Sequence, residues 1–496
     1  MKELPQNNNI IPDRWLKYIL FYAVSFAFIL LNAYLVLKKD TLLGIVVPVA
    51  FAVILTAIYS YDKIIWLTIF FVPLSIPLKD LIPGLPFDMS LPSEPFLFGI
   101  LIVFLLSLLL GKKIDRNITR HPVSIAIYFY LAWMLITSFS SCIPLVSFKY
   151  LLSRIWFIVA FFFILTYLFK KSANIEKFVW IFVIAFLPVI FYTIGRHLSY
   201  GLYNDQAAHW VMTPFFNDHT SYGAVLAMYI PFLVGFSLSG ISNKKYRIWI
   251  WAVTAIFLLA EVLSYARAAW LGLFLALGIW GIMRLKIKFK TIAITILSLF
   301  IIVVAFQDQI LQKLEQNSQD SSANLLDHFT SMTNISTDAS NLERINRWNC
   351  ALKMFSEKPF LGWGPGTYAM KYAPYQVTSQ RTIISTNSGN GGNAHSEYLG
   401  ALAESGVLGS LSFVALIIVV LTIGIRAYSK TDDKRLKTLI ICAILGLITY
   451  YAHGVLNNFL DTDKASVPFW GFTAIIVAID LEIKQQKNTR LEEQNG

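Results

Sequence analysis

Residues 395–425 read HSEYLGALAESGVLGSLSFVALIIVVLTIGI and decide the class of fold. The stretch from Leu411 to Ile425 is almost wholly apolar, and a polar run, NSGNGGN at 387–393, comes directly before His395. We therefore expect a membrane helix to begin here, with His395 near its first turn. At that position the partial positive charge of the helix N-terminus favours a neutral imidazole, which is the form that a general base needs near pH 7.

Similar apolar runs recur along almost the whole chain. Hydrophobic residues make up 56% of the sequence and charged residues 14%, well below the roughly one quarter that is usual in soluble domains. Runs of about 17 to 25 residues are long enough to cross the hydrocarbon core of a membrane. The sequence predicts an all-α integral membrane protein, a polytopic bundle of about 12 to 14 transmembrane helices. The predicted spans are 15–37, 41–59, 63–80, 94–111, 122–141, 151–169, 175–195, 221–239, 247–264, 268–284, 290–306, 397–425, 438–457 and 465–483.

The positions of the basic residues predict the orientation. The formal net charge is +12, but the lysines and arginines fall in alternate loops, which is typical of a polytopic membrane protein rather than of a nucleic-acid-binding one. The basic loops, expected in the cytoplasm, are those around 112–120, 170–177, 244–247, 284–290 and 426–437. Both termini are then cytoplasmic, and the loops around 196–220, 264–267, 307–396 and 457–465 face the other side. In a bacterium this describes a protein of the inner membrane with a periplasmic face.

The predicted organisation has three parts. Residues 1–306 form the N-terminal transmembrane helices, 307–396 a large periplasmic loop, and 397–496 the C-terminal transmembrane helices with a cytoplasmic tail. Within the loop, 312–340 reads as a polar linker. Apolar residues from Leu342 to Phe355 have helical spacing, which predicts a short amphipathic helix on the membrane surface or over a cavity.

Three arginines of the expected external side are candidates to bind an anion. Arg267 lies between two predicted spans, and Arg344 and Arg347 lie on the amphipathic helix. A guanidinium stays charged and offers a planar fork of donors, which suits a diphosphate. The alternatives are that Arg267 anchors a helix end by snorkelling and that Arg344 and Arg347 form a solvated helix face.

Several polar residues near the same face are secondary candidates. His453 and Asn457 lie one turn apart in a predicted span, where polar groups are costly and usually face a cavity; hydrogen bonding between helices would explain them equally well. Asp461 follows at the external end and could orient an imidazole or contact a sugar hydroxyl. Asp218 is either a site residue or a helix cap, and Glu397 either contacts sugar, orients His395 or complements the helix dipole.

No metal site is expected. The three cysteines do not make a zinc site, and His197, His209 and His219 match no compact spacing of metal ligands.

The motifs resemble a known family. His395-Ser396, followed after nine residues by Gly406-Val407-Leu408-Gly409, is similar to the histidine motif of the O-antigen ligases, and Arg267 with Leu271 is similar to their arginine-leucine motif. Residues 344–348 and 357–364 resemble the external loop of the wider O-antigen ligase and polymerase superfamily. The resemblance covers roughly residues 220–425.

This resemblance implies a membrane glycosyltransferase that needs no cofactor or metal. Its donor would be a glycan linked to undecaprenyl diphosphate, and its acceptor a hydroxyl of a lipid A-core sugar or a related glycan. His395 would be the catalytic base, and Arg267 with one or both of Arg344 and Arg347 would bind the donor diphosphate. Transfer would invert the anomeric centre. The alternative is an O-antigen or exopolysaccharide polymerase with the same lipid-linked donor, and a remoter one is a flippase for lipid-linked glycans.

Overall fold

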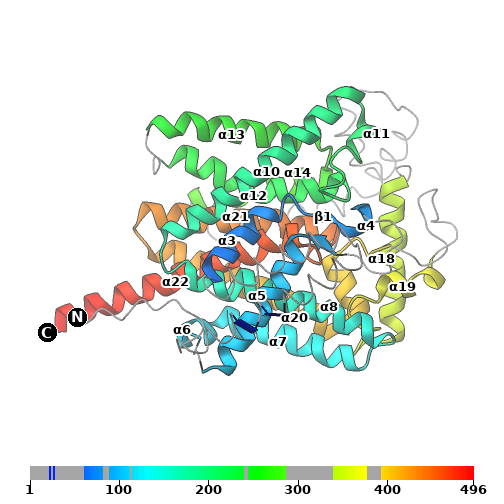
Figure 1. Ribbon diagram of the computed structural model, residues 1–496, viewed down its shortest axis with the longest axis horizontal. Helices are drawn as coiled ribbons and strands as arrows, with labels where there is room; N and C mark the ends of the chain where they lie inside the picture. The colour runs from blue at the N-terminus through cyan, green and yellow to red at the C-terminus, as the bar shows by residue number, and fades with distance from the viewer. Residues whose placement is uncertain are drawn as a thin grey trace, which may run out of the picture.

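The computed structural model describes residues 22–23, 26–27, 61–81, 89–111, 114–239, 244–285, 339–376 and 392–495. In these ranges the chain is an all-α bundle of long helices with one two-stranded hairpin (Figure 1). Nine helices of this described part are long and apolar enough to cross a membrane, so the predicted class of fold, a polytopic α-helical membrane protein, is confirmed. These spans are Pro122–Phe139, Pro144–Leu168, Ala173–Tyr200, His219–Leu238, Tyr246–Leu263, Arg267–Leu285, Glu397–Lys430, Lys434–Leu456 and Asp463–Thr489.

The N-terminal part departs from the predicted spans. The expected span 63–80 is not one helix, because α3 (Tyr61–Phe71) is followed by a turn, the strand β1 (Ile76–Pro77) and the short helix α4 (Leu78–Leu81). Strand β1 pairs antiparallel with β2 (Ser90–Leu91), which leads into α5 (Ser93–Leu109). Pro73 and Pro77, in the stretch after Phe71, lack the backbone N–H of a continuing helix, which favours the break seen there. The predicted spans 41–59 and 290–306, and nearly all of 15–37, lie outside the described residues, and the expected division at residue 306 stays a prediction.

The remaining helices follow the predicted spans with shifted ends. Most shifts extend a helix into the polar caps that flank its apolar run. The elements are α6 (Arg116–Thr119), α7 (Pro122–Phe139), α8 (Pro144–Ile158), the π-helix η1 (Val159–Ile164), α9 (Leu165–Leu168), α10 (Ala173–Tyr200), α11 (Asp205–Ala208), α12 (His219–Leu238), α13 (Lys244–Leu263), α14 (Arg267–Leu285), α18 (Ala339–Glu357), α19 (Tyr368–Lys371), the 3₁₀ helix η3 (Ala373–Tyr375), α20 (Glu397–Lys430), α21 (Lys434–Leu456) and α22 (Asp463–Asn495).

Helix α21 forms the centre of the bundle. It packs most extensively against α12 and α14 and also contacts α20 and α22. Small residues make the close approaches: Gly446 of α21 lies against the backbone of Met228, and Gly272 of α14 lies against the backbone of Thr449. In membranes, where lipid is as apolar as the core, such close van der Waals packing provides much of the attraction between helices.

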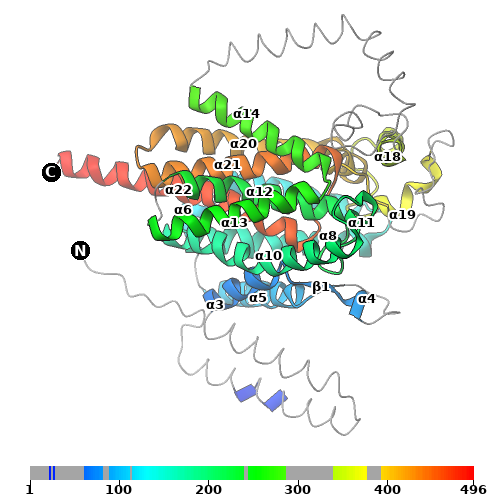
Figure 2. The ribbon, with the colours of Figure 1, turned by 90° about the horizontal axis from the view of Figure 1, so that it is seen from above.

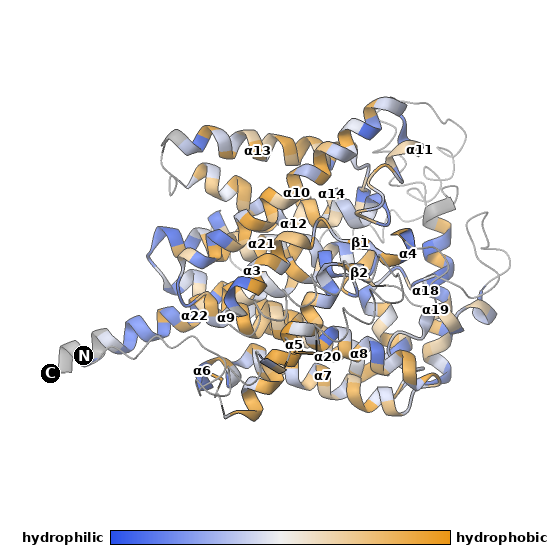
Figure 3. Ribbon diagram, viewed as in Figure 1, coloured by the Kyte–Doolittle hydropathy of each residue, from blue (hydrophilic) through white to orange (hydrophobic). Residues whose placement is uncertain are grey.

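The two ends of the bundle differ in composition. Helices α18, α19 and α11 gather at one end, and the C-terminal part of α22 extends from the other (Figures 1 and 2). The middle of the bundle is hydrophobic, and hydrophilic segments lie mainly toward its ends (Figure 3). The predicted amphipathic helix exists as α18 and packs on α20.

Helix α20 contains a break that receives the loop after α18. Gly406 has a φ of +68° and interrupts the helix. Beside the break, the carbonyls of Ala403 and Glu404 accept hydrogen bonds from the backbone N–H groups of Trp363 and Gly364 at 3.1 and 2.7 Å. The segment that approaches Gly406 closely is the loop at Phe360.

We predict that Gly406→Ala lowers the free energy of unfolding by about 1 to 3 kcal/mol. An alanine at positive φ is strained, and its Cβ would press on the carbonyl group of Phe360. The measurement is the thermal unfolding of the purified protein in detergent. Gly278→Ala is the matched control, because Gly278 lies exposed in α14 with open space around it. Equal stability of the two variants would contradict this account of the break.

Candidate functional site

The site lies where three connections of the bundle meet at one end. The segment before α20 brings His395, the connection between α21 and α22 brings Asn457, and α18 lies across both. Trp348 of α18 donates from Nε1 to the carbonyl of His395 at 3.2 Å. Ser396 caps α20 by accepting from Leu399 N–H at 3.3 Å. His395 therefore stands just before the first turn of a membrane helix, as predicted.

The imidazole of His395 is half-buried, and its backbone has a positive φ of 47°. Burial, and after it the charges of Arg344 and Arg347, lower its pKa from 6.5 to about 4, while a hydrogen bond with the Asn457 side chain acts in the opposite direction. The ring is thus neutral near pH 7, as expected. The helix dipole was the expected cause; burial is the largest contribution to the shift, and the two arginines add to it.

Asn457 links two imidazoles. Its Nδ2 lies 3.2 Å from Nε2 of His453, which is buried. With the amide nitrogen engaged there, the amide oxygen is left to accept from a ring N–H of His395, in agreement with the direction in which this bond shifts the pKa of His395. The other ring nitrogen of His395 then carries a lone pair, which is the arrangement of a base held by a neighbouring orienting group.

Arg344 faces this cluster of imidazoles. Its charge acts on His395, His453 and His219. Arg267, the first residue of α14, also acts on His219. The side chains of Arg344 and Arg267 are both half-buried. Two guanidinium groups from separate parts of the sequence therefore act on His219, and that of Arg344 also acts on His395.

Arg347 has a different environment. Its side chain is buried, its Nε donates to Glu343 at 2.6 Å, and its guanidinium lies 3.8 Å from the centre of the Tyr372 ring. Tyr368 donates to the carbonyl of Arg347 at 2.7 Å. Glu343 therefore compensates the charge of Arg347 within the buried part of α18.

Asp218 and Glu397 make defined structural contacts. Asp218 caps α12, accepting from Ser221 N–H and from the Thr220 hydroxyl, each at 2.7 Å, and its charge also acts on His219 and His453. Oε1 of Glu397 accepts from Tyr450 at 2.6 Å and from two backbone N–H groups, those of residues 459 and 460, at 2.9 Å. Glu397 therefore positions the connection that carries Asn457.

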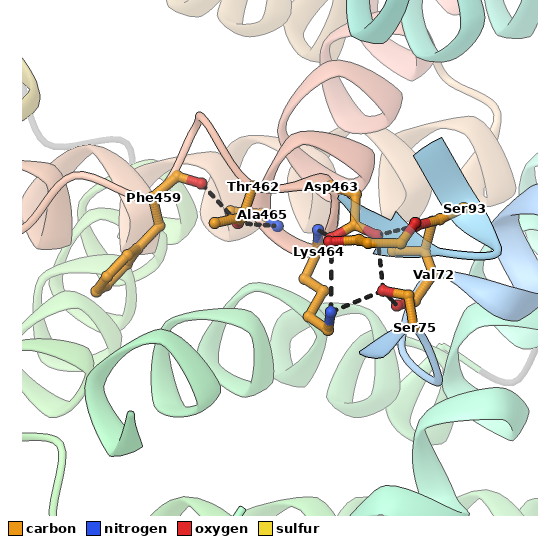
Figure 4. Close-up of polar contacts among 9 residues, drawn as sticks. Val72, Ser75, Ser93, Phe459, Thr462, Asp463, Lys464 and Ala465 are labelled. Atoms are coloured by element: carbon orange, nitrogen blue, oxygen red, sulfur yellow. Dashed lines mark hydrogen bonds and ion pairs between the residues drawn. The ribbon is translucent and has the colours of Figure 1, made fainter. Parts of the chain in front are cut away.

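Asp461 is exposed and lines a cavity together with Asn458 of the same connection. The nearby Asp463 and Lys464 lie in a separate contact (Figure 4). Asp463 accepts from Ser75 at 2.8 Å and from Ser93, and Lys464 donates to Ser75 at 2.7 Å. This network joins the start of α22 to Ser75, just before β1, and to Ser93, the first residue of α5.

Sequence reasoning missed two polar residues near the site. Arg154 is 2% exposed within the predicted span 151–169, and Asn458 follows Asn457 in the connection. An arginine inside an apolar run is itself a signal of a functional pocket, but the averaged hydropathy of the span obscured it.

Within the described ranges, no group of three histidine, cysteine or acidic side chains is arranged to hold a metal ion.

The structure is that of a polytopic membrane protein in which His395 lies just before a membrane helix and within the influence of the charges of Arg344 and Arg347. The sequence profile of the O-antigen ligase family matches residues 252–414, which include His395, Arg267, Arg344 and Arg347. This match supports membership of the O-antigen ligase superfamily.

An uncharacterized protein of Haemophilus influenzae (strain ATCC 51907 / DSM 11121 / KW20 / Rd) is 26% identical over 253 residues. The match covers 47% of this chain and 57% of that relative, so it spans little more than half of the relative's length.

We predict that Arg344→Gln raises the pKa of His395 from about 4 toward the ordinary 6.5, because a positive charge that opposes protonation is removed. The measurement is a titration of ¹⁵N-histidine-labelled protein by nuclear magnetic resonance, with His395→Gln used for assignment. Lys353→Gln is the matched control, since it removes an exposed positive charge from the same helix. A wild-type pKa near 6.5, or equal shifts in both variants, would contradict the proposed electrostatics.

Proposed function

We propose that the protein is an O-antigen ligase-like membrane glycosyltransferase. It moves a glycan from undecaprenyl diphosphate to a hydroxyl of a lipid A-core or related acceptor at the periplasmic face. The observation that carries this proposal is that the charge of Arg344 acts on His395 and that Arg344 and Arg267 both act on His219. The family match supports the same class of enzyme.

The reaction needs a base and a place for the leaving diphosphate. His395 takes the proton from the acceptor hydroxyl, and the oxygen of that hydroxyl forms a bond with the anomeric carbon of the donor sugar. The bond from this carbon to the diphosphate breaks, and its electron pair leaves with undecaprenyl diphosphate. Attack in line with the leaving group inverts the anomeric centre.

The arginines stabilise the charge that develops on the leaving group. In this proposal Arg344 and Arg267 bind the diphosphate with fixed positive charge, and this charge supplies the electrostatic stabilisation without a metal ion. Arg347 supports the position of α18 through its contact with the Tyr372 ring, and its positive charge acts on His395. Asn457 orients His395, and His453 orients Asn457.

We place the protein in the bacterial inner membrane with the site in the periplasm and both termini in the cytoplasm. The lysines and arginines of the predicted cytoplasmic loops support this orientation. Helix α18 lies at one end of the bundle, and the tail of α22 lies at the other (Figure 2). A site at one face suits a transferase better than a flippase, which needs a binding site near the middle of the membrane.

We predict that His395→Ala and Arg267→Ala each lower glycan transfer at least a hundredfold while the protein still inserts and folds. The first variant removes the base and the second removes charge from the leaving-group site. The measurement is the glycan attached to lipid A-core in a deletion strain that carries each variant. Arg284→Ala is the matched control, because Arg284 lies exposed at the other end of the same helix, α14.

Full transfer by folded His395→Ala or Arg267→Ala would overturn the assignment of the site. The products of the deletion strain separate the two enzymes that share this donor chemistry. A ligase leaves long lipid-linked chains and a bare core when it is lost. The alternative, a polymerase, leaves single repeats on the core.

A further inference from the structure

A second cavity lies beside the His395 segment and is not used by the steps above. Its volume is about 160 Å³, and it is lined from α7, α8, α20 and the connections before α20 and before α22. Asn393, Ala394 and Ser396, the neighbours of His395, form part of its wall. The chain segment that carries the proposed base thus borders both the arginine site and this cavity.

Arg154 of α8 is the buried cation of the cavity. It is 2% exposed, and it donates to the carbonyl of Leu460 and to the hydroxyl of Tyr150. Its Nε has no hydrogen-bond partner within the described part of the chain. A buried guanidinium N–H without a partner costs free energy unless a ligand or ordered water accepts its hydrogen bond.

The acceptors of the cavity are on the connection between α21 and α22. The carboxylate of Asp461 is exposed to the cavity. The side-chain oxygen of Asn458, also in the wall, is buried and has no partner among the described residues. By contrast, Glu397 and Glu404 are engaged by backbone N–H groups, that of Tyr368 donating to Glu404 at 2.9 Å. One donor and two acceptors therefore remain for a ligand.

The lining does not favour an anion as the occupant. Three carboxyl groups, those of Glu397, Glu404 and Asp461, line the cavity with the single cation Arg154, so the lining offers a phosphate no excess of positive charge. A sugar ring fits better, because its hydroxyls both donate and accept. The rings of Tyr130, Trp133 and Tyr150 also line the cavity and offer apolar faces to the C–H surface of a sugar.

The size agrees with this chemistry. The volume given is the space open to the centre of a water-sized sphere, and one water molecule needs roughly 10 to 15 Å³ of it. The observed 160 Å³ therefore accommodates on the order of ten water-sized groups, which corresponds to one hexose ring with its hydroxyls.

We propose that this cavity is a saccharide subsite in which Arg154, Asn458 and Asp461 hold the hydroxyls of one uncharged sugar ring. The claim that this ring belongs to a substrate of glycan transfer rests on the proposed function. The claim that the cavity binds a sugar is independent of it. The ring comes from either the acceptor or the donor glycan, since both present the same hydroxyls.

Binding is tested first, without transfer. Saturation-transfer NMR is recorded on the full-length protein in nanodiscs with glucose, galactose or N-acetylglucosamine, and with inorganic pyrophosphate as competitor. We expect a signal from at least one sugar that pyrophosphate does not displace. Asp461→Asn should weaken binding about tenfold, the loss expected when a hydrogen bond to a charged group is removed. Asp432→Asn, an exposed carboxylate away from the cavity, should change nothing.

His395→Ala should leave sugar binding intact, so failure of the catalytic proposal would not by itself remove the subsite. Absence of any sugar signal, displacement by pyrophosphate, or equal signals from Asp461→Asn and wild type would overturn the subsite.

A transfer assay then identifies the source of the ring. A higher KM for the acceptor alone in Asp461→Asn assigns the acceptor glycan, and a higher KM for the donor alone assigns the donor glycan. Unchanged KM values for both would exclude a role in transfer.

Discussion

The carboxylate of Glu397 is the contact on which the geometry of the site depends. It stands at the start of α20 and accepts from Tyr450 and from the backbone N–H groups of Phe459 and Leu460, at 2.6 to 2.9 Å. These bonds fix the connection between α21 and α22 against the segment that carries His395. A half-buried carboxylate that accepts several hydrogen bonds is held firmly, because the loss of any of them would leave part of its charge without a partner. The position of Asn457 beside His395 follows from this attachment.

The same attachment separates two kinds of environment. On one side, Arg344 and Arg267 act on a group of neutral imidazoles. On the other, Asp461 and the engaged glutamates surround Arg154 in a cavity. A lipid diphosphate needs positive charge, whereas an uncharged sugar ring needs hydrogen-bond donors and acceptors. The first environment offers the positive charge and the second offers the donors and acceptors, and the segment that carries His395 borders both. We infer that this division orients the substrates before the proton is transferred.

The sequence was sufficient for features that depend on composition and on the order of elements. The apolar periodicity predicted the bundle, and the charge of the loops predicted that Arg267, Arg344 and His395 share one face. It was insufficient where contacts between distant segments decide the outcome. The bond between Asn457 and His395 joins two separate connections, and Arg347 is covered by the ring of Tyr372 from a later segment, although its ion pair with Glu343 is local to α18. Arg154 was missed because its apolar neighbours dominate the span, and the N-terminal helix was overextended because the hairpin after Phe71 contains apolar residues as well.

The affinity of the purified protein for undecaprenyl diphosphate in nanodiscs tests the central claim, that fixed arginine charge binds the leaving group while His395 serves the acceptor. Loss of one charge-assisted contact in Arg344→Gln should weaken this binding by roughly 10- to 100-fold. His395→Ala should leave it unchanged, because a neutral base contributes no charge to the diphosphate. Undiminished binding by Arg344→Gln, or an equal loss in both variants, would contradict the account.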